Sequence, residues 1–158
     1  MPCCASVRQR LASDLNTLSS APSKPKSLLV LTSTYPRWSG DPDPGFVHEL
    51  NRRLASRGFE VDVLTPRAPD LPGVEVMDGV NVYRYGYFLR RLEQLSYDGG
   101  ILPKLKANPL YFGLVPFLLV GLVRAVRARI RARDYHFVHA HWIIPQASCA
   151  CIARGSGR

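Results

Sequence analysis

The sequence is short of acidic residues, although its length and hydrophobic content are those of a folded domain. Only 12 Asp and Glu stand against 21 Lys and Arg, which gives a formal net charge of +9. Such an excess favours an anionic partner but does not choose among phosphate, nucleic acid and acidic lipid. The 158 residues are 46% hydrophobic, which argues against wholesale disorder and suits one globular domain with tails.

Cysteine is scarce, and its spacing is wrong for a zinc ribbon. The four cysteines are Cys3, Cys4, Cys149 and Cys151, so the chain contains no CxxC pair. We therefore expect free thiols in a reducing cytoplasm, and no metal site.

The first 26 residues lack a continuous apolar run, and residue 2 is Pro. A secretory signal needs such a run, and myristoylation needs Gly at position 2, so neither is indicated. Residues 1–26 are predicted to form a polar, disordered tail.

Motifs that identify many enzymes are missing as well. The chain has no GxGxxG fingerprint, no GxxxxGK[ST] loop, no GxSxG elbow, no HExxH helix and no EF-hand loop. A dinucleotide fold with the usual fingerprint and a P-loop enzyme are therefore not indicated.

From residue 27 onward, apolar runs alternate with helical patterns. The run in 27–33 suits a strand that is covered on both faces, helical spacing follows over 44–57, and 59–66 reads as a second strand. This spacing is typical of a βαβ unit with parallel strands. Over 74–85 two short strands flank an Asp-Gly dipeptide, which predicts a hairpin at the edge of the sheet. The expected fold class is α/β.

A long apolar and basic segment follows. Its apolar half, 110–123, has fourteen residues, which is too short to span a bilayer because a spanning helix needs about 20. Arg124, Arg127 and Arg131 then share one side of a predicted amphipathic helix that ends near residue 133. The helix is interpreted as packing on the core with a solvated face, and contact with a membrane surface is the alternative.

Two unusual features follow predicted strands, where open parallel sheets bind their ligands. The first is "TYPRWSGDPDPGFVHEL", residues 34–50, in which Gly45 falls in the first turn of the helix. Free backbone N–H groups and the helix dipole there attract a phosphate, and glycine lets it come close. A plain turn capped by Asp43 is an equally good interpretation.

The second feature is "HAHW" at the end of a predicted buried strand over 135–144. His139 and His141 are two residues apart, so they share one face of the strand. They could donate to a sugar hydroxyl or a phosphate, or form a metal pair, or be buried histidines satisfied by backbone carbonyls. The residues alone indicate an anion-binding α/β domain.

The order of these pieces resembles a known family. "LLVLTSTYPRWSGDPDPGFVHELNRRLASRGFEVDVLTP", then "GILPKLKANPL", then "FVHAHWIIPQ" resembles the N-terminal domain of family 4 glycosyltransferases, which are retaining enzymes of GT-B fold. The resemblance implies a Rossmann-like parallel sheet with flanking helices over residues 27–148. It also implies a second, donor-binding domain, which does not occur within this chain.

The resemblance assigns roles to four residues. It implies that Gly40 and Gly45 approach the donor diphosphate, that His141 is the catalytic contact to the transferred sugar, and that His139 supports it. The implied substrates are a GDP- or UDP-sugar and a glycan or lipid-linked acceptor, with no metal or other cofactor. The implied location is the cytoplasm, peripheral to an anionic inner membrane face.

The end of the chain departs from this pattern. Residues 149–158, "CACIARGSGR", replace the apolar helix that we expect, so an aberrant or disordered end and a truncated, inactive product are predicted. A non-catalytic module that binds phosphate or sugar and needs a separate partner is the alternative. Nucleic-acid binding is disfavoured, since the sequence shows no aromatic stacking platform.

Overall fold

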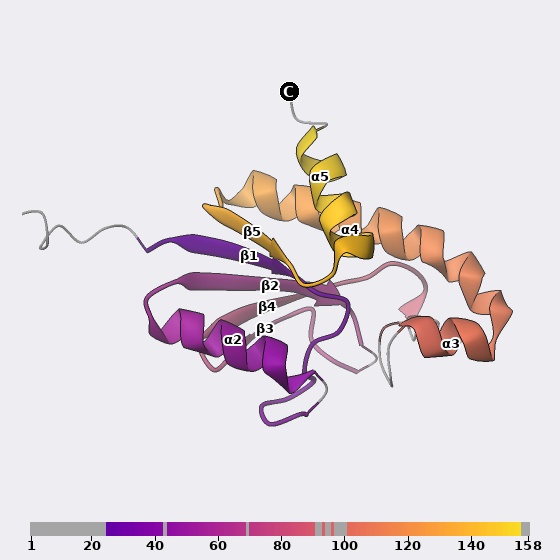
Figure 1. Cartoon of the computed structure of the whole chain (residues 1–158), viewed down its shortest axis with the longest axis horizontal. Helices are drawn as coiled ribbons and strands as arrows, with labels where there is room; N and C mark the ends of the chain where they lie inside the picture. The colour runs from indigo at the N-terminus through magenta and orange to yellow at the C-terminus, as the bar shows by residue number, and fades with distance from the viewer. Residues whose placement is uncertain are drawn as a thin grey trace, which may run out of the picture.

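The computed structural model describes residues 25–42, 44–68, 70–90, 93, 96 and 101–155. They form a five-stranded sheet with helices on both faces (Figure 1). Residues 1–24 of the predicted tail lie outside the described part. In chain order the elements are β1 (Ser27–Leu31), α2 (Gly45–Ser56), β2 (Glu60–Pro66), β3 (Val74–Met77), β4 (Val80–Tyr85), α3 (Ile101–Ala107), the 3₁₀ helix η2 (Pro109–Leu114), α4 (Val115–Ala132), β5 (Phe137–Ala140), the π-helical turn η3 (Ile143–Ala147) and α5 (Ser148–Gly155).

The strand order is β3-β4-β2-β1-β5, with β4, β2, β1 and β5 parallel and β3 antiparallel to β4. This confirms the α/β prediction and the hairpin at the sheet edge. The hairpin turns at Asp78 and Gly79, which have φ values of 48° and 80°. Two successive residues with positive φ match the twist of the flanking strands, which is why the Asp-Gly pair suits this turn.

The apolar run of β1 serves two cores because alternate side chains point to opposite faces. Leu28 and Val30 join the cluster under α2, whereas Leu29 and Leu31 pack against α4 and α5. Figure 1 shows α2 on one side of the strands, and α4 and α5 on the opposite side. A strand covered on both faces was predicted from the lack of polar alternation, and it is confirmed.

Helix α2 begins and ends within one residue of its predicted limits, 44–57. Gly58 follows it with φ +85°, the left-handed conformation that stops a helix. The N-cap residue is Pro44, and no side-chain hydrogen bond from that residue caps the helix. Asp43, the predicted cap, lies outside the described residues.

The prediction that the apolar segment is too short to span a membrane is wrong on length. With η2 and the basic half of α4 included, Pro109–Ala132 forms one helical stretch of 24 residues, long and apolar enough by length and composition to cross a membrane. Three residues of α4 are nevertheless buried against the domain, namely Leu118, Leu122 and Val126. This packing confirms that one face of α4 lies on the core, and it does not test contact of the other face with a membrane surface.

Two predictions near the C-terminus need correction. Strand β5 was expected to be buried, but it lies at the edge of the sheet and Phe137 is exposed. Residues 149–158 were expected to be aberrant or disordered, but Ser148–Gly155 form α5, and Cys149 and Ala153 are buried against β1 and α4. Small residues one helical turn apart let α5 approach its neighbours closely, and the sequence pattern did not reveal this contact. Cys149 and Cys151 are free thiols, as predicted.

Candidate active site

The loop after β1 is held in place by polar contacts. Asp41, which is buried, accepts hydrogen bonds from the backbone N–H and the guanidinium of Arg37 at 3.0 and 2.9 Å. Arg84 of β4 donates to the carbonyl just before Arg37 at 2.8 Å, and Ser39 donates to Asp78 at 3.0 Å. The loop is therefore fixed to the hairpin at both its beginning and its middle.

A buried histidine on α2 extends this network. The hydroxyl of Tyr35 lies 2.7 Å from Nδ1 of His48, and Nε2 of His48 lies 2.8 Å from a carboxylate oxygen of Asp78. These distances fit an imidazole that accepts a hydrogen bond from Tyr35 at Nδ1 and donates one to Asp78 from Nε2. The bond from His48 lowers the pKa of Asp78, while burial raises the pKa of Tyr35. Sequence reasoning missed His48 because its partner belongs to a different element.

Gly40 and Gly45 line one open hollow of about 480 Å³ between the loop, α2 and the hairpin turn. Three carboxylates, those of Asp41, Glu49 and Asp78, line the same hollow against one guanidinium, that of Arg52. A diphosphate therefore has to approach Gly45 from outside this hollow. A Cβ atom added to Gly45 would meet nothing within 4 Å, and therefore a ligand can approach its backbone. The N–H groups of Gly45 and Val47 donate to the carbonyls of Pro42 and Pro44 at 2.8 and 3.2 Å, so both already have partners within the turn. An anion at this end is therefore attracted mainly by the helix dipole.

His141 lies directly after β5, beside the end of β1. Its backbone N–H donates to the carbonyl of Leu31 at 3.0 Å, which fixes its position next to the loop. Its ring packs edge-to-face on Phe46 with 6.2 Å between centroids, and 4.6 Å separates it from the ring of His139. Phe46 is the second residue of α2, so His141 lies beside the helix N-terminus that contains Gly45.

The imidazole of His141 is neutral and partly available. Burial, with a smaller contribution from His139, holds its pKa below the usual value. Its Nε2 atom is buried and has no hydrogen-bond partner among the described residues. Satisfaction by a backbone carbonyl, the alternative interpretation, therefore does not apply to this nitrogen. A buried nitrogen without a partner is unusual, and a ligand group could satisfy it.

The structure thus brings Gly45 and His141 to one place and connects Gly40 to them through the loop. His139 is exposed, and its ring covers one side of His141. Phe46, which joins the two parts, was not predicted. Its only signal was its position next to Gly45, since the partner ring comes from a distant part of the chain.

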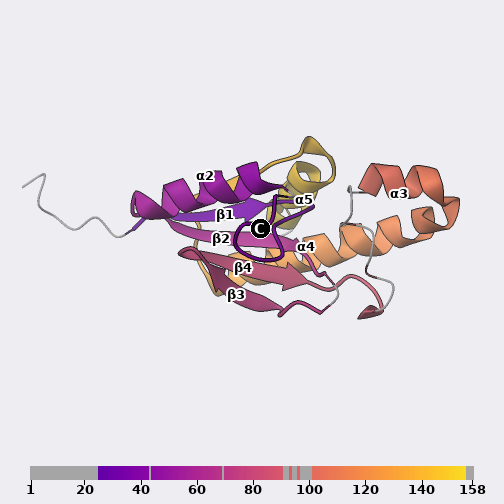
Figure 2. The ribbon, with the colours of Figure 1, turned by 90° about the horizontal axis from the view of Figure 1, so that it is seen from below.

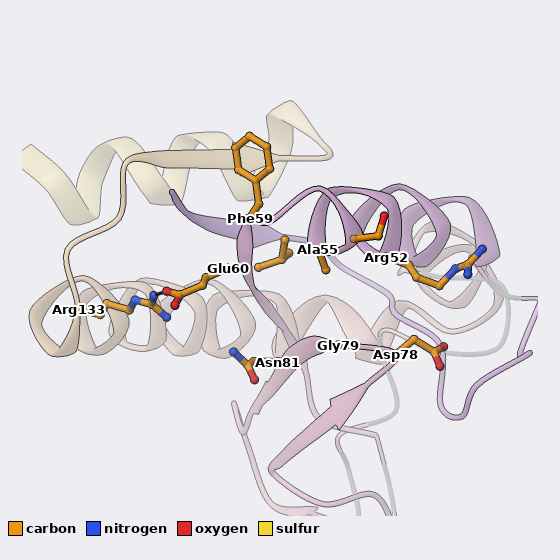
Figure 3. Close-up of a pocket in the computed structure, with 10 residues that line it drawn as sticks. Arg52, Ala55, Phe59, Glu60, Asp78, Gly79, Asn81 and Arg133 are labelled. Atoms are coloured by element: carbon orange, nitrogen blue, oxygen red, sulfur yellow. Dashed lines mark ion pairs between the residues drawn. The ribbon is translucent and has the colours of Figure 1, made fainter. Parts of the chain in front are cut away.

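A separate hollow of about 560 Å³ lies between the end of α2, the start of β2 and the hairpin turn (Figure 3). Arg133 forms an ion pair with Glu60 at its rim. This hollow contains none of the predicted site residues. It also lies at the amino end of β2, away from the strand ends where parallel sheets bind ligands.

A family model described as "Glycosyl transferase 4-like domain" matches residues 46–158. The chain belongs to this family. The match confirms the predicted resemblance and includes His139, His141 and α5. It begins one residue after Gly45. The match assigns no role to single residues, so the roles of Gly40, Gly45, His139 and His141 all stay predictions. The α/β architecture of this glycosyl transferase 4-like domain is consistent with the N-terminal Rossmann-like half of a GT-B glycosyltransferase.

One curated relative is D-inositol 3-phosphate glycosyltransferase from Nocardiopsis dassonvillei, which is 35% identical over 112 residues. The aligned part covers 69% of this chain and 23% of the relative. The glycosyl transferase 4-like domain therefore spans about a quarter of the length of that enzyme. No solved structure matches the chain.

Proposed function

We propose that this chain is the acceptor-side half of a retaining glycosyltransferase. It works with a donor-binding domain to move a sugar from a GDP- or UDP-sugar to a glycan or lipid-linked acceptor, in the cytoplasm at the inner face of the plasma membrane. The observation that carries this proposal is the unpartnered Nε2 atom of His141 beside the first turn of α2. Membership of the glycosyl transferase 4-like family supports it.

Each residue of the site then has a physical task. As the glycosidic bond to the donor breaks, negative charge grows on the diphosphate, and the N-terminal dipole of α2 stabilises it. Gly45 lets the diphosphate reach the backbone, because the space beside its Cα is open. His141, neutral and held by Phe46, hydrogen-bonds the transferred sugar. A second domain closes over the site and excludes water.

The two tryptophans provide a direct test of ligand binding. Trp38 lies in the loop, Trp142 follows His141, and both are exposed, so intrinsic fluorescence reports on this site. We expect GDP or inorganic pyrophosphate to change the fluorescence saturably. The substitution Gly45→Val should weaken this binding roughly tenfold or more, since a bulky side chain fills the open space through which the diphosphate approaches the start of α2.

Gly113→Ala is the matched control, because Gly113 also has open space beside it but lies in η2, away from the site. No saturable change with either ligand would contradict the proposed diphosphate contact. Equal affinities of Gly45→Val and Gly113→Ala would contradict it as well.

The 158-residue chain by itself should not transfer sugar. One helix N-terminus on an open surface leaves the diphosphate half solvated, and electrostatic stabilisation is weak in water. We expect no release of nucleoside diphosphate from GDP- or UDP-sugars above the background of His141→Ala. Turnover that His141→Ala abolishes would disprove the need for a second domain and would still support the role of His141.

A further inference from the structure

The segment from α3 to the residue after α4 carries only positive charge. Residues 101–133 contain no Asp or Glu and seven basic residues, namely Lys104, Lys106, Arg124, Arg127, Arg129, Arg131 and Arg133. Arg129 and Arg133 are bound to carboxylates of β2. Arg124, Arg127 and Arg131 have no ion-pair partner within the described part of the chain.

Large apolar side chains are exposed at the other end of this segment. Leu110 and Phe112 of η2 are 83% and 60% exposed, and Phe117 and Val120 of α4 are 49% and 58% exposed. The inward residues of the same stretch, Tyr111, Leu114 and Leu118, pack with Tyr87. Phe117 also contacts the ring of Phe88, with 4.8 Å between centroids, but about half of its surface remains exposed. Leaving these large apolar side chains in water is costly.

The apolar and basic side chains share a face of α4. Phe117, Val120, Arg124, Arg127 and Arg131 all line one shallow groove, and they follow one another at steps of three and four residues. Figures 1 and 2 show that α3 and the beginning of α4 extend past the ends of the strands. A helix with bulky apolar residues next to unpaired arginines is typical of one that lies in a membrane surface.

Spanning the bilayer is disfavoured although the stretch is long enough. Leu122 and Val126 are buried with Leu29, Leu31 and Leu64 of the sheet. Moving them into lipid would uncover a face of β1 and β2. The part before Leu118 packs with Tyr87, beyond the end of β4. It is shorter than the roughly 20 residues that a spanning helix needs.

We propose that Leu110, Phe112, Phe117 and Val120, with Arg124, Arg127 and Arg131, form a lipid-facing surface that docks on an anionic bilayer. The apolar side chains enter the interface and the arginines meet lipid phosphates. The start of α4 packs beside Tyr87, just after β4, so docking brings the carboxyl end of the sheet towards the membrane. This extends the proposed function but does not depend on it, because lipid binding is measured without any sugar.

Co-sedimentation with vesicles tests the proposal on the full chain. We expect binding to vesicles of phosphatidylglycerol and phosphatidylcholine, and roughly tenfold weaker binding to phosphatidylcholine alone. The triple variant R124Q/R127Q/R131Q should bind the anionic vesicles roughly tenfold more weakly than the unmodified chain. R52Q/R53Q/R57Q, in the second half of α2 and at its C-cap, changes the net charge equally and should bind as the unmodified chain does.

A second pair of variants tests the apolar side chains of the proposed surface. Leu110→Ser with Phe112→Ser should weaken binding roughly tenfold. Val74→Ser with Val76→Ser removes two exposed apolar side chains from the edge strand β3, outside the proposed surface, and should not weaken binding. Circular dichroism checks that all variants keep the fold.

Four results would overturn the proposal. The first is equal binding to neutral and to anionic vesicles, and the second is an equal loss of binding in the test and control variants. The third is that the chain stays with membranes during alkaline carbonate extraction, which indicates a spanning helix. The fourth is a dimer in lipid-free solution that the Leu110 and Phe112 substitutions dissociate.

Discussion

Replacing Asp62 with alanine is expected to destabilise the fold by about 3–5 kcal/mol. The carboxylate of Asp62 is fully buried within β2 and accepts hydrogen bonds from Tyr135 at 2.5 Å, Asn81 at 2.8 Å and Arg129 at 3.3 Å. Removing it leaves three donors without their acceptor in a place with little water. Burial, with the bond to Asp62, raises the pKa of Tyr135 to about 12, as expected for a hydroxyl that donates to a carboxylate.

Urea unfolding followed by circular dichroism measures this loss. Glu49→Ala is the matched control, since Glu49 also accepts from arginines, Arg52 and Arg53, but on the exposed face of α2. That substitution should leave the unfolding midpoint nearly unchanged, because water replaces the lost partners. If Asp62→Ala shifts the unfolding midpoint as little as Glu49→Ala does, the stabilising role of Asp62 is contradicted.

Replacing Gly121 with valine should cost about 1–3 kcal/mol or more, because it forces α4 away from the segment after β4. A Cβ atom at residue 121 would lie 2.8 Å from Cβ and 3.1 Å from Cα of Tyr87, and 3.3 Å from the carbonyl oxygen of Gly86. Backbone atoms cannot rotate out of the way as the end of a side chain can. Even Gly121→Ala should therefore destabilise the chain.

Gly113→Ala gives the comparison at a glycine with open surroundings. It should be neutral or stabilising by about 0.4–1 kcal/mol, since alanine has less backbone freedom to lose on folding. Both effects are read from urea midpoints. Equal midpoints for Gly121→Ala and Gly113→Ala would show that the close approach of α4 to Tyr87 is absent in solution.

Much of the fold was predictable from local patterns. The apolar run of β1 and the spacing of β1, α2 and β2 predicted parallel strands, and the Asp-Gly pair predicted the hairpin. Helix α5 was missed because its contacts come from small residues, Cys149 and Ala153, that give no strong periodic signal. The exposure of β5 was missed because a short apolar run looks the same in a central and in an edge strand.

The candidate site was predictable only in part. The rule that ligands gather at strand ends pointed to the loop and to His141. Neither Phe46 against His141 nor His48 between Tyr35 and Asp78 could be foreseen, since each contact joins elements whose separation depends on the whole fold. The carboxylates around Gly40 could not be foreseen either, although they decide from which side an anion can approach.

The sequence by itself determined β1, α2, β2 and the hairpin, the parallel order of the first strands, and the separation of charge along the segment 101–133. These follow from backbone geometry and side-chain periodicity, which act over a few residues. Only the tertiary structure decided that Nε2 of His141 lacks a partner among the residues that the structure describes, and that Asp62 joins three donors. It also decided that Leu110, Phe112 and Val120 of η2 and α4 are exposed. The reason is that burial and pairing depend on distances between segments, which no local pattern specifies.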